Sequence, residues 1–273
     1  MKTTSWCAPT YPLQNGDYAV LGDLGALLVV ADGMGGANAG EVASAIAVHT
    51  IQQMFAPENI RGVVNDDSAI QSFMKDVVKS ADLNIFRRSQ QDESARGMGT
   101  TIVMAWILGT RAYVCWCGDS RCYAFNYNRG LLQISKDHSY VQELVDHGEL
   151  EPEYMHDHPL SNVITRCLGD MEKRANPDTK VYELADGDTV MLCSDGLCGY
   201  CTDDDIRRVF ASEYVETDEC CQKMLDCALD AGGADNIAIV MASLIDDGQE
   251  KPDVVKPSWL GALLQKLFGS RGN

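Results

Sequence analysis

Aspartates beside glycines recur along this chain at points where apolar runs end. In the clearest case, buried-looking aliphatic residues lead to Asp32, which glycines follow. A single Asp-Gly pair is weak evidence, because aspartate also favours turns through hydrogen bonds to its own backbone. Repetition is stronger evidence, since glycine lets a ligand approach the backbone closely. The pattern predicts metal ligands delivered at element boundaries, at positions Asp17, Asp32, Asp119, Asp195 and Asp235.

Cysteine and histidine provide weaker metal patterns. Cys198 and Cys201 have the spacing of a zinc or redox pair, but no second pair at zinc-ribbon spacing accompanies them. Most of the 11 cysteines, such as Cys115, lie in apolar runs and are interpreted as small buried residues. The histidines of residues 137–177, His138 among them, have spacings that fit no common metal site. We interpret them as solvated residues of a surface excursion.

The composition is that of a globular protein. With 273 residues, of which 45% are hydrophobic, the chain can bury the core of one large domain or two small ones. Its net charge of −18 argues against nucleic acid, whose phosphates require a basic surface. No segment resembles a signal peptide or approaches the ~20 apolar residues of a membrane span, so we expect a cytoplasmic protein.

Strands are expected in the centre of the chain, with helices around them. Apolar or alternating runs predict strands, arranged in the middle of the chain as a meander of hairpins, over residues 27–31, 100–108, 111–117, 121–126, 131–135, 189–193 and 236–245. Residues 41–55, 70–85, 203–211 and 218–231 are expected to be helical, the second of these after a capping aspartate. Without regular βαβ alternation, the pattern favours α+β layers over a doubly wound sheet.

Eight motifs stand in a fixed order along the chain. They are Asn15 to Asp17, Ala31 to Gly36, Gly97 to Thr101, Gly118 to Arg121, Lys136 to Ser139, Asn162 to Arg166, Cys193 to Leu197 and Gly232 to Ile237. Over residues 12–245 this order resembles the metal-dependent protein phosphatases, the protein phosphatase 2C family, and its bacterial members in particular. An ordered set is far more specific than one glycine pattern.

The resemblance implies a central antiparallel β-sandwich flanked by helices on both faces. It also implies hydrolysis of phosphoserine and phosphothreonine in proteins by a water activated between two Mn²⁺ or Mg²⁺ ions, with a third ion in bacterial members. All-oxygen ligands agree with these hard cations. By resemblance the catalytic residues are Asp32, Asp195 and Asp235, and the metal ligands are Asp17, Asp32, the carbonyl of Gly33, Asp119, Asp195 and Asp235. Arg121 and Arg166 lie in family motifs and are open to two interpretations, ion-pair partner or phosphate ligand.

Two positions depart from the family pattern. Pro12 stands where an arginine commonly holds the phosphate, and Gly16 stands where a glutamate often precedes the first aspartate. Without a guanidinium, phosphate loses a bidentate partner. Two alternatives therefore stay open beside the phosphatase: a catalytically impaired phosphatase-like binding or scaffold protein, and a hydrolase of small phosphate esters.

The end of the chain differs in composition from the rest. We predict a catalytic domain over residues 1–246, a linker over 247–257 and an amphipathic tail over 258–273, whose apolar stripe runs from Trp259 to Phe268. The tail either packs on its own domain or contacts a protein partner or a membrane surface. The expected partners are phosphorylated proteins, the products of a Ser/Thr kinase, and we expect a monomer.

Overall fold

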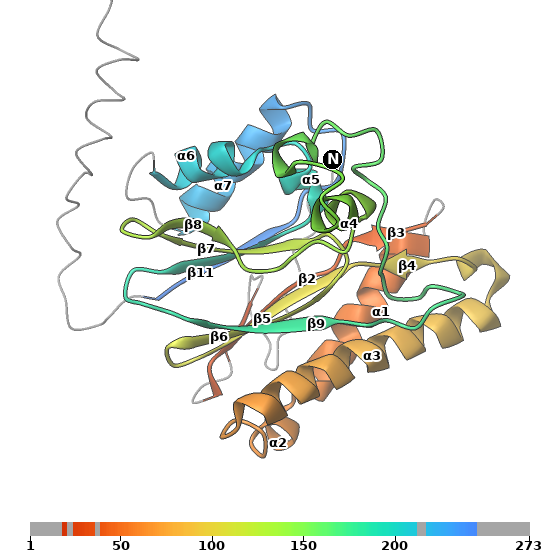
Figure 1. Ribbon diagram of the computed structural model, residues 1–273. Helices are drawn as coiled ribbons and strands as arrows, with labels where there is room; N and C mark the ends of the chain where they lie inside the picture. The colour runs from red at the N-terminus through yellow and green to blue at the C-terminus, as the bar shows by residue number, and fades with distance from the viewer. Residues whose placement is uncertain (1–17, 21–23, 36–38, 212–216, 245–273) are drawn as a thin grey trace, which may run out of the picture.

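The computed structural model describes residues 18–20, 24–35, 39–211 and 217–244. Two antiparallel sheets lie in the middle, and helices cover their outer faces (Figure 1). The predicted α+β sandwich is confirmed. One sheet has the order β1 (Tyr18–Val20), β2 (Ala26–Val30), β5 (Ile102–Leu108), β6 (Arg111–Cys117), β9 (Asp178–Glu183). The other has the order β11 (Ile239–Ser243), β10 (Thr189–Cys193), β7 (Arg121–Asn126), β8 (Gly130–Gln133), and β3 (Gly33–Met34) pairs with β4 (Gly99–Thr100).

Strand β2 is apolar along its whole length because both of its faces are buried. Leu28 and Val30 belong to the core between the two sheets, together with Val190 of the facing sheet. Leu27 and Val29 belong to the core between the five-stranded sheet and its helices. The uninterrupted apolar run therefore marks a central strand covered on both sides.

Two long helices cover the five-stranded sheet. They are α1 (Ala39–Met54) and α3 (Asp67–Gln91), with the short α2 (Pro57–Ile60) between them and the 3₁₀ turn η2 (Glu93–Ala95) after α3. The Asp66 carboxylate accepts hydrogen bonds from the N–H groups of Ser68 and Ala69, so α3 begins at the predicted cap. Trp106 of β5 is fully buried in this layer and meets Phe55 edge to face at 5.1 Å.

Three shorter helices cover the four-stranded sheet: α5 (Asp195–Cys198), α6 (Asp203–Ala211) and α7 (Thr217–Asp230). Reciprocal hydrogen bonds open α6, because Thr202 N–H donates to the Asp205 carboxylate and Asp205 N–H donates to Thr202 Oγ1. The acidic residues 203–205 therefore begin a helix. Cys193 is buried in this layer, in agreement with the interpretation of most cysteines as small buried residues, and Cys198 of the predicted pair is buried here as well.

Two features differ from the prediction made from the sequence. The central hairpins do not form one meander, because β6 and β7 belong to different sheets and the chain crosses between the sheets at residues 118–120. Gly118 makes this crossing with φ +124°, a conformation that L side chains rarely adopt. Strand β9 lies at an edge and is only partly buried, so its residues carry little of the apolar signal that identifies a strand.

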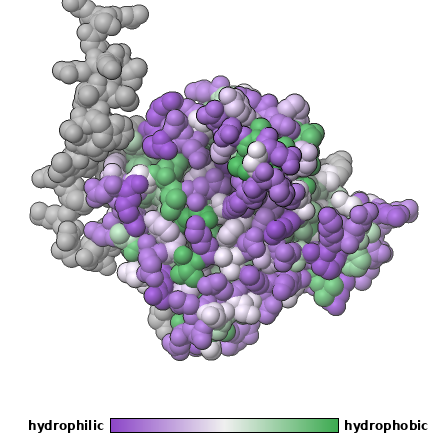
Figure 2. Space-filling model, in the orientation of Figure 1, coloured by the Kyte–Doolittle hydropathy of each residue, from purple (hydrophilic) through white to green (hydrophobic). Residues whose placement is uncertain are grey.

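The excursion over residues 137–177 contains α4 (Tyr140–Asp146) and η3 (Pro152–Tyr154), and α4 lies beside α5 (Figure 1). On the face drawn in Figure 2 hydrophilic residues predominate, and the hydrophobic ones form separate patches. Among the helices that the structure describes, none has the length and apolarity needed to span a bilayer. The domain boundary at residue 246, the linker and the tail lie outside the described residues.

Candidate metal centre and active-site cleft

Four of the predicted carboxylates lie in the described part of the chain, each near the end of a strand. Asp32 follows β2, Asp119 lies in the crossover from β6 to β7, Asp195 is the first residue of α5 and comes two positions after the end of β10, and Asp235 precedes β11. Strand β2 contacts both β10 and β11, so strand ends from the two sheets meet. Asp17 lies outside the described residues, and its role as a ligand stays a prediction.

These carboxylates repel one another electrostatically. Burial, a hydrogen bond with Asp195 and the charges of Asp195, Asp235 and Asp119 raise the pKa of Asp32 to about 9. Burial and the charges of Asp195 and Asp137 raise the pKa of Asp119 to about 7. The structure therefore brings together Asp32, Asp119, Asp195 and Asp235 in a place where negative charge is poorly compensated.

The donor set fits a hard divalent cation. The Oδ1 atom of Asp195 is buried without a hydrogen-bond partner among the described residues, which is costly for a carboxylate unless a cation approaches it. Carboxylate oxygens are the ligands that Mg²⁺ and Mn²⁺ prefer. In the described part of the chain, no three His, Cys, Asp or Glu side chains lie close enough together to hold a metal ion as they stand.

Gly33 follows Asp32 at a close contact between β3 and α1. A Cβ atom built on Gly33 would lie 2.0 Å from the carbonyl oxygen of Gly40, so this approach requires glycine. This contact alone accounts for a glycine at position 33, whether or not its carbonyl binds a metal ion. The proposed role of the Gly33 carbonyl as a ligand stays a prediction.

Two threonines hold the backbone around Asp32. The Asp32 N–H donates to Thr101 Oγ1 at 3.2 Å, and the Asp32 carbonyl accepts from Thr100 Oγ1 and from the Thr101 N–H, both at 2.8 Å. Thr101 Oγ1 also lies 2.7 Å from Oγ of Ser120, the neighbour of Asp119. These hydroxyls therefore link the segments that carry two of the carboxylates. Their roles were missed from the sequence, although each stands in a recognised motif.

A second set of contacts joins α5 to the segment before β11. A Cβ atom on Gly196 would lie 2.0 Å from the carbonyl oxygen of Asn236. The Ser194 N–H donates to the carbonyl of Ala238 at 3.0 Å, and Ser194 Oγ accepts from the Ala238 N–H at 3.0 Å. This close approach holds the neighbouring residues Asp195 and Asp235 near each other, although they are about 40 residues apart in the chain.

A cleft of about 980 Å³ opens beside these carboxylates. It is bounded by the α4–η3 segment on one side and by residues 198–204, with α5, on the other. Its lining includes Asp119, Asp195, Asp235, Val141, Val145, Met155, Tyr200, Cys201, Asp203 and Asp204. A cleft of this size can accept a peptide side chain together with its neighbours.

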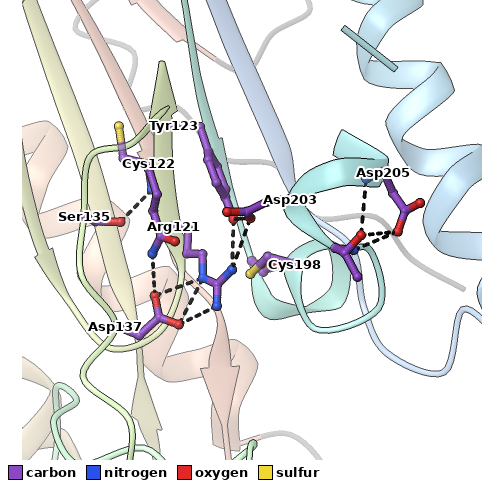
Figure 3. A network of polar contacts seen from close by, with 11 residues as sticks. Arg121, Cys122, Tyr123, Ser135, Asp137, Cys198, Asp203 and Asp205 are labelled. Carbon is purple, nitrogen blue, oxygen red and sulfur yellow. Dashed lines mark hydrogen bonds and ion pairs between the residues drawn. The ribbon is translucent and has the colours of Figure 1, made fainter. Parts of the chain in front are cut away.

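Arg121 lies in the lining of the cleft as an ion-pair partner (Figure 3). Its Nε and Nη2 atoms donate to both oxygens of Asp137 at 2.7–3.0 Å, and Nη1 donates to the hydroxyl of Tyr123 at 2.9 Å. That hydroxyl donates to Asp203 at 3.0 Å. Since the Arg121 side chain is 18% exposed and fully engaged, the geometry favours a structural ion pair over a phosphate ligand.

His138 is buried, so the interpretation of this histidine as a solvated loop residue was wrong. Its Nδ1 accepts from the Gly118 N–H at 3.2 Å, and its Nε2 lies 3.0 Å from an Asp178 oxygen and 3.2 Å from Nη1 of Arg166. Burial lowers the pKa of His138, which favours the neutral ring. Arg166 is itself paired with Asp178 at 3.2 Å. The spacing of histidines along the chain carries no information about this burial.

The chain matches known proteins over most of its length. Residues 14–231 match the family model described as "Protein phosphatase 2C". The serine/threonine protein phosphatase PstP of Mycobacterium tuberculosis is 33% identical over 231 residues, which are 83% of this chain but only 42% of PstP. The serine/threonine phosphatase stp of Listeria monocytogenes is 31% identical over 79% of this chain and 83% of its own.

A solved structure shows the same likeness. The catalytic domain of M. tuberculosis PstP, in complex with 2 manganese ions, aligns with a TM-score of 0.69 at 32% identity, covering 86% of this chain and 94% of that one.

Proposed function

We propose that this chain, which belongs to the protein phosphatase 2C family, is a metal-dependent phosphatase. Its proposed substrates are phosphoserine and phosphothreonine in proteins. The observation that carries the proposal is the group of uncompensated carboxylates, Asp32, Asp119, Asp195 and Asp235, beside a cleft of about 980 Å³. The names of the relatives support the substrate class, and the manganese complex of PstP supports Mn²⁺ or Mg²⁺ as the cofactor.

The residues of this chain hold and orient the reacting groups. Asp32, Asp195 and Asp235 would hold the ions through carboxylate oxygens, with Asp119 as a further ligand. When bound, divalent ions would supply positive charge that lowers the pKa of a water molecule and offsets the charge of the phosphate. The hydroxyls of Thr100 and Thr101 fix the backbone of Asp32. The walls of the cleft hold the substrate so that water attacks phosphorus opposite the leaving oxygen, and we assign no protein nucleophile.

The test compares substrates and metal ligands. Wild-type protein should hydrolyse a phosphothreonine peptide with Mn²⁺ and not with a chelator. Asp32→Asn and Asp195→Asn should abolish this turnover while the protein stays folded, because a neutral amide holds a cation less well. Asp230→Asn, an exposed site on α7, is the matched control and should keep the wild-type rate.

Each alternative has its own result. Hydrolysis of an aryl phosphate but of no phosphopeptide would favour a hydrolase of small phosphate esters. A folded, Mn²⁺-binding protein that hydrolyses neither substrate would favour a scaffold. Wild-type rates in Asp32→Asn or Asp195→Asn would contradict the two-ion assignment.

A further inference from the structure

Two thiols meet in the wall of the cleft. The Sγ atoms of Cys201 and Cys227 are 3.2 Å apart, and neither cysteine forms a disulfide. Cys201 follows α5 and lines the cleft, whereas Cys227 lies on α7 behind it. Cys201 is 1% exposed and Cys227 is half-buried. The pair therefore joins a partly exposed cysteine to a buried one whose sulfur is in direct contact with it.

We propose that Cys201 and Cys227 form a reversible disulfide when a peroxide oxidises the protein, and that this bond ties the cleft wall to α7. The Cys227 thiol loses its proton and its sulfur attacks a peroxide oxygen. The O–O bond breaks, Cys227 becomes a sulfenic acid, and the departing hydroxide takes up the released proton as the first water. Cys201 sulfur then attacks the sulfenic sulfur, the S–O bond breaks, and the departing hydroxide takes the Cys201 proton as the second water. Two thiols lose two electrons, and the peroxide gains them.

The order of attack follows from the surroundings of each sulfur. Burial and the neighbouring Cys227 thiol raise the pKa of Cys201 to about 12, so Cys201 is a poor first nucleophile. Cys227, the more exposed residue of the two, is the better first target, and the 3.2 Å contact then favours capture by Cys201. The spacing in the sequence suggests instead a pair of Cys198 with Cys201. In the fold, however, the thiol of Cys198 donates to the Ser194 carbonyl at 3.5 Å, whereas the thiol of Cys201 meets that of Cys227.

The disulfide would act close to the metal centre. Helix α5 has four residues and begins at Asp195. The Cys201 N–H donates to the carbonyl of Leu197 in this helix at 2.8 Å, so a backbone hydrogen bond connects Cys201 to α5. A covalent tie at Cys201 therefore restricts a wall that must adapt to a bound peptide. We expect oxidation to lower phosphopeptide turnover at least about threefold and to raise the melting temperature, because the cross-link restricts the unfolded chain.

The bond can be located by mass spectrometry on the full chain. Protein treated with hydrogen peroxide is alkylated, digested with trypsin and analysed before and after reduction. The tryptic fragment that starts at Met224 contains Cys227 as its only cysteine. It should appear linked to the fragment that ends at Arg207, which contains Cys201. Cys227→Ser and Cys201→Ser should both remove the link, whereas Cys198→Ser should keep it.

Two further readouts test the consequence. Peroxide should raise the melting temperature and lower phosphopeptide turnover in the wild type and in the control Cys221→Ser, a neighbouring cysteine on α7, but not in Cys227→Ser. A dithiol should reverse both changes. Absence of the link, or its survival in Cys201→Ser, would overturn the site. An equal loss of turnover in Cys227→Ser would overturn the switch. The mass result does not depend on the proposed phosphatase activity.

Discussion

At the residue scale, the candidate metal centre holds like charges together. The Asp195 side chain contributes to the raised pKa of Asp32, and two neighbouring buried carboxylates cannot both ionise without repulsion. A cation relieves the repulsion, so metal affinity and proton affinity must be coupled at this site. The protein is then expected to be most sensitive to pH when the metal has been removed.

This coupling predicts the pH dependence of the chelated protein. The folded-state pKa of Asp32, about 9, is raised above the ordinary value of 3.8, so the folded state binds the extra proton. The contribution of this proton to the free energy of unfolding is complete at pH values below the pKa of the unfolded state. It is lost as the pH rises through the pKa of the folded state. With EDTA we expect the melting temperature to fall by several degrees between about pH 7 and pH 9. Asp32→Asn should flatten this slope, and Mn²⁺ should restore stability. A flat wild-type curve would show that Asp32 stays ionised.

A second prediction at this scale concerns His138, which accepts the Gly118 N–H beside Asp119. His138→Ala leaves this buried donor without its partner, at a cost of about 1–3 kcal/mol in the free energy of unfolding. Because the crossover that carries Asp119 loses its support, half-maximal activity should require more Mn²⁺. Urea unfolding and a Mn²⁺ titration measure the two effects. His147→Ala, at an exposed histidine of the same excursion, is the control. Equal behaviour of the two variants would refute the role of His138.

At the scale of elements, the site depends on close backbone contacts between segments that are distant in the chain. Helix α5 can reach the segment before β11 only because Gly196 has no side chain. Strand β3 approaches α1 through Gly33 and Gly40 for the same reason. The distance between carboxylates is therefore controlled by the packing of glycines as much as by the strands themselves.

The contact at Gly196 gives a prediction with a matched control. In Gly196→Ala the new Cβ atom would lie 2.0 Å from the Asn236 carbonyl, so α5 and the segment before β11 must separate. We expect weaker Mn²⁺ binding by isothermal titration calorimetry and a lower melting temperature. Gly62→Ala introduces the same methyl group where no atom lies within 4 Å, and it should change neither quantity. Unchanged Mn²⁺ affinity in Gly196→Ala would show that the spacing of the carboxylates does not depend on this contact.

The limits of sequence reasoning are visible at the same scale. Strand β2 and helix α3 could be predicted because their apolar patterns are local, and the ordered motifs identified the carboxylates. The hydrogen bond between Asp32 and Thr101 joins positions 69 residues apart, and no local pattern contains it. The crossover at residues 118–120 could not be predicted either. Two successive hairpins show the same alternation of apolar residues whether they lie in one sheet or in two. Burial of His138 depends on contacts with three distant segments.

At the scale of the whole molecule, the sandwich holds the described carboxylates of the candidate site, whereas the predicted amphipathic tail lies outside the described residues. The carboxylates of the candidate site all precede residue 236. The apolar stripe from Trp259 to Phe268 contributes no candidate ligand. The tail is therefore expected to act through its own packing or docking.

Deletion of residues 250–273 tests this expectation. The truncated protein should keep the wild-type rate on a small aryl phosphate, because the deletion removes none of the carboxylates. Its melting temperature separates the two interpretations of the tail. A clear fall indicates self-packing, since burial of each Leu-class side chain contributes roughly 1.5–3 kcal/mol. An unchanged value indicates docking, which liposome flotation and pull-down with the isolated tail can assign. Loss of aryl phosphate hydrolysis without a fall in melting temperature would contradict both interpretations.

The meeting of β2 with β11 has a consequence for biosynthesis. Asp32 leaves the ribosome early, but its partner Asp235 is translated 203 residues later. At usual translation rates that interval is on the order of 10–40 s. During this time the nascent chain carries Asp32 without Asp235, so it cannot assemble the complete ion site. Metal uptake at the candidate site is therefore expected to follow translation of Asp235, and a chain that stops before Asp235 should not assemble the complete site.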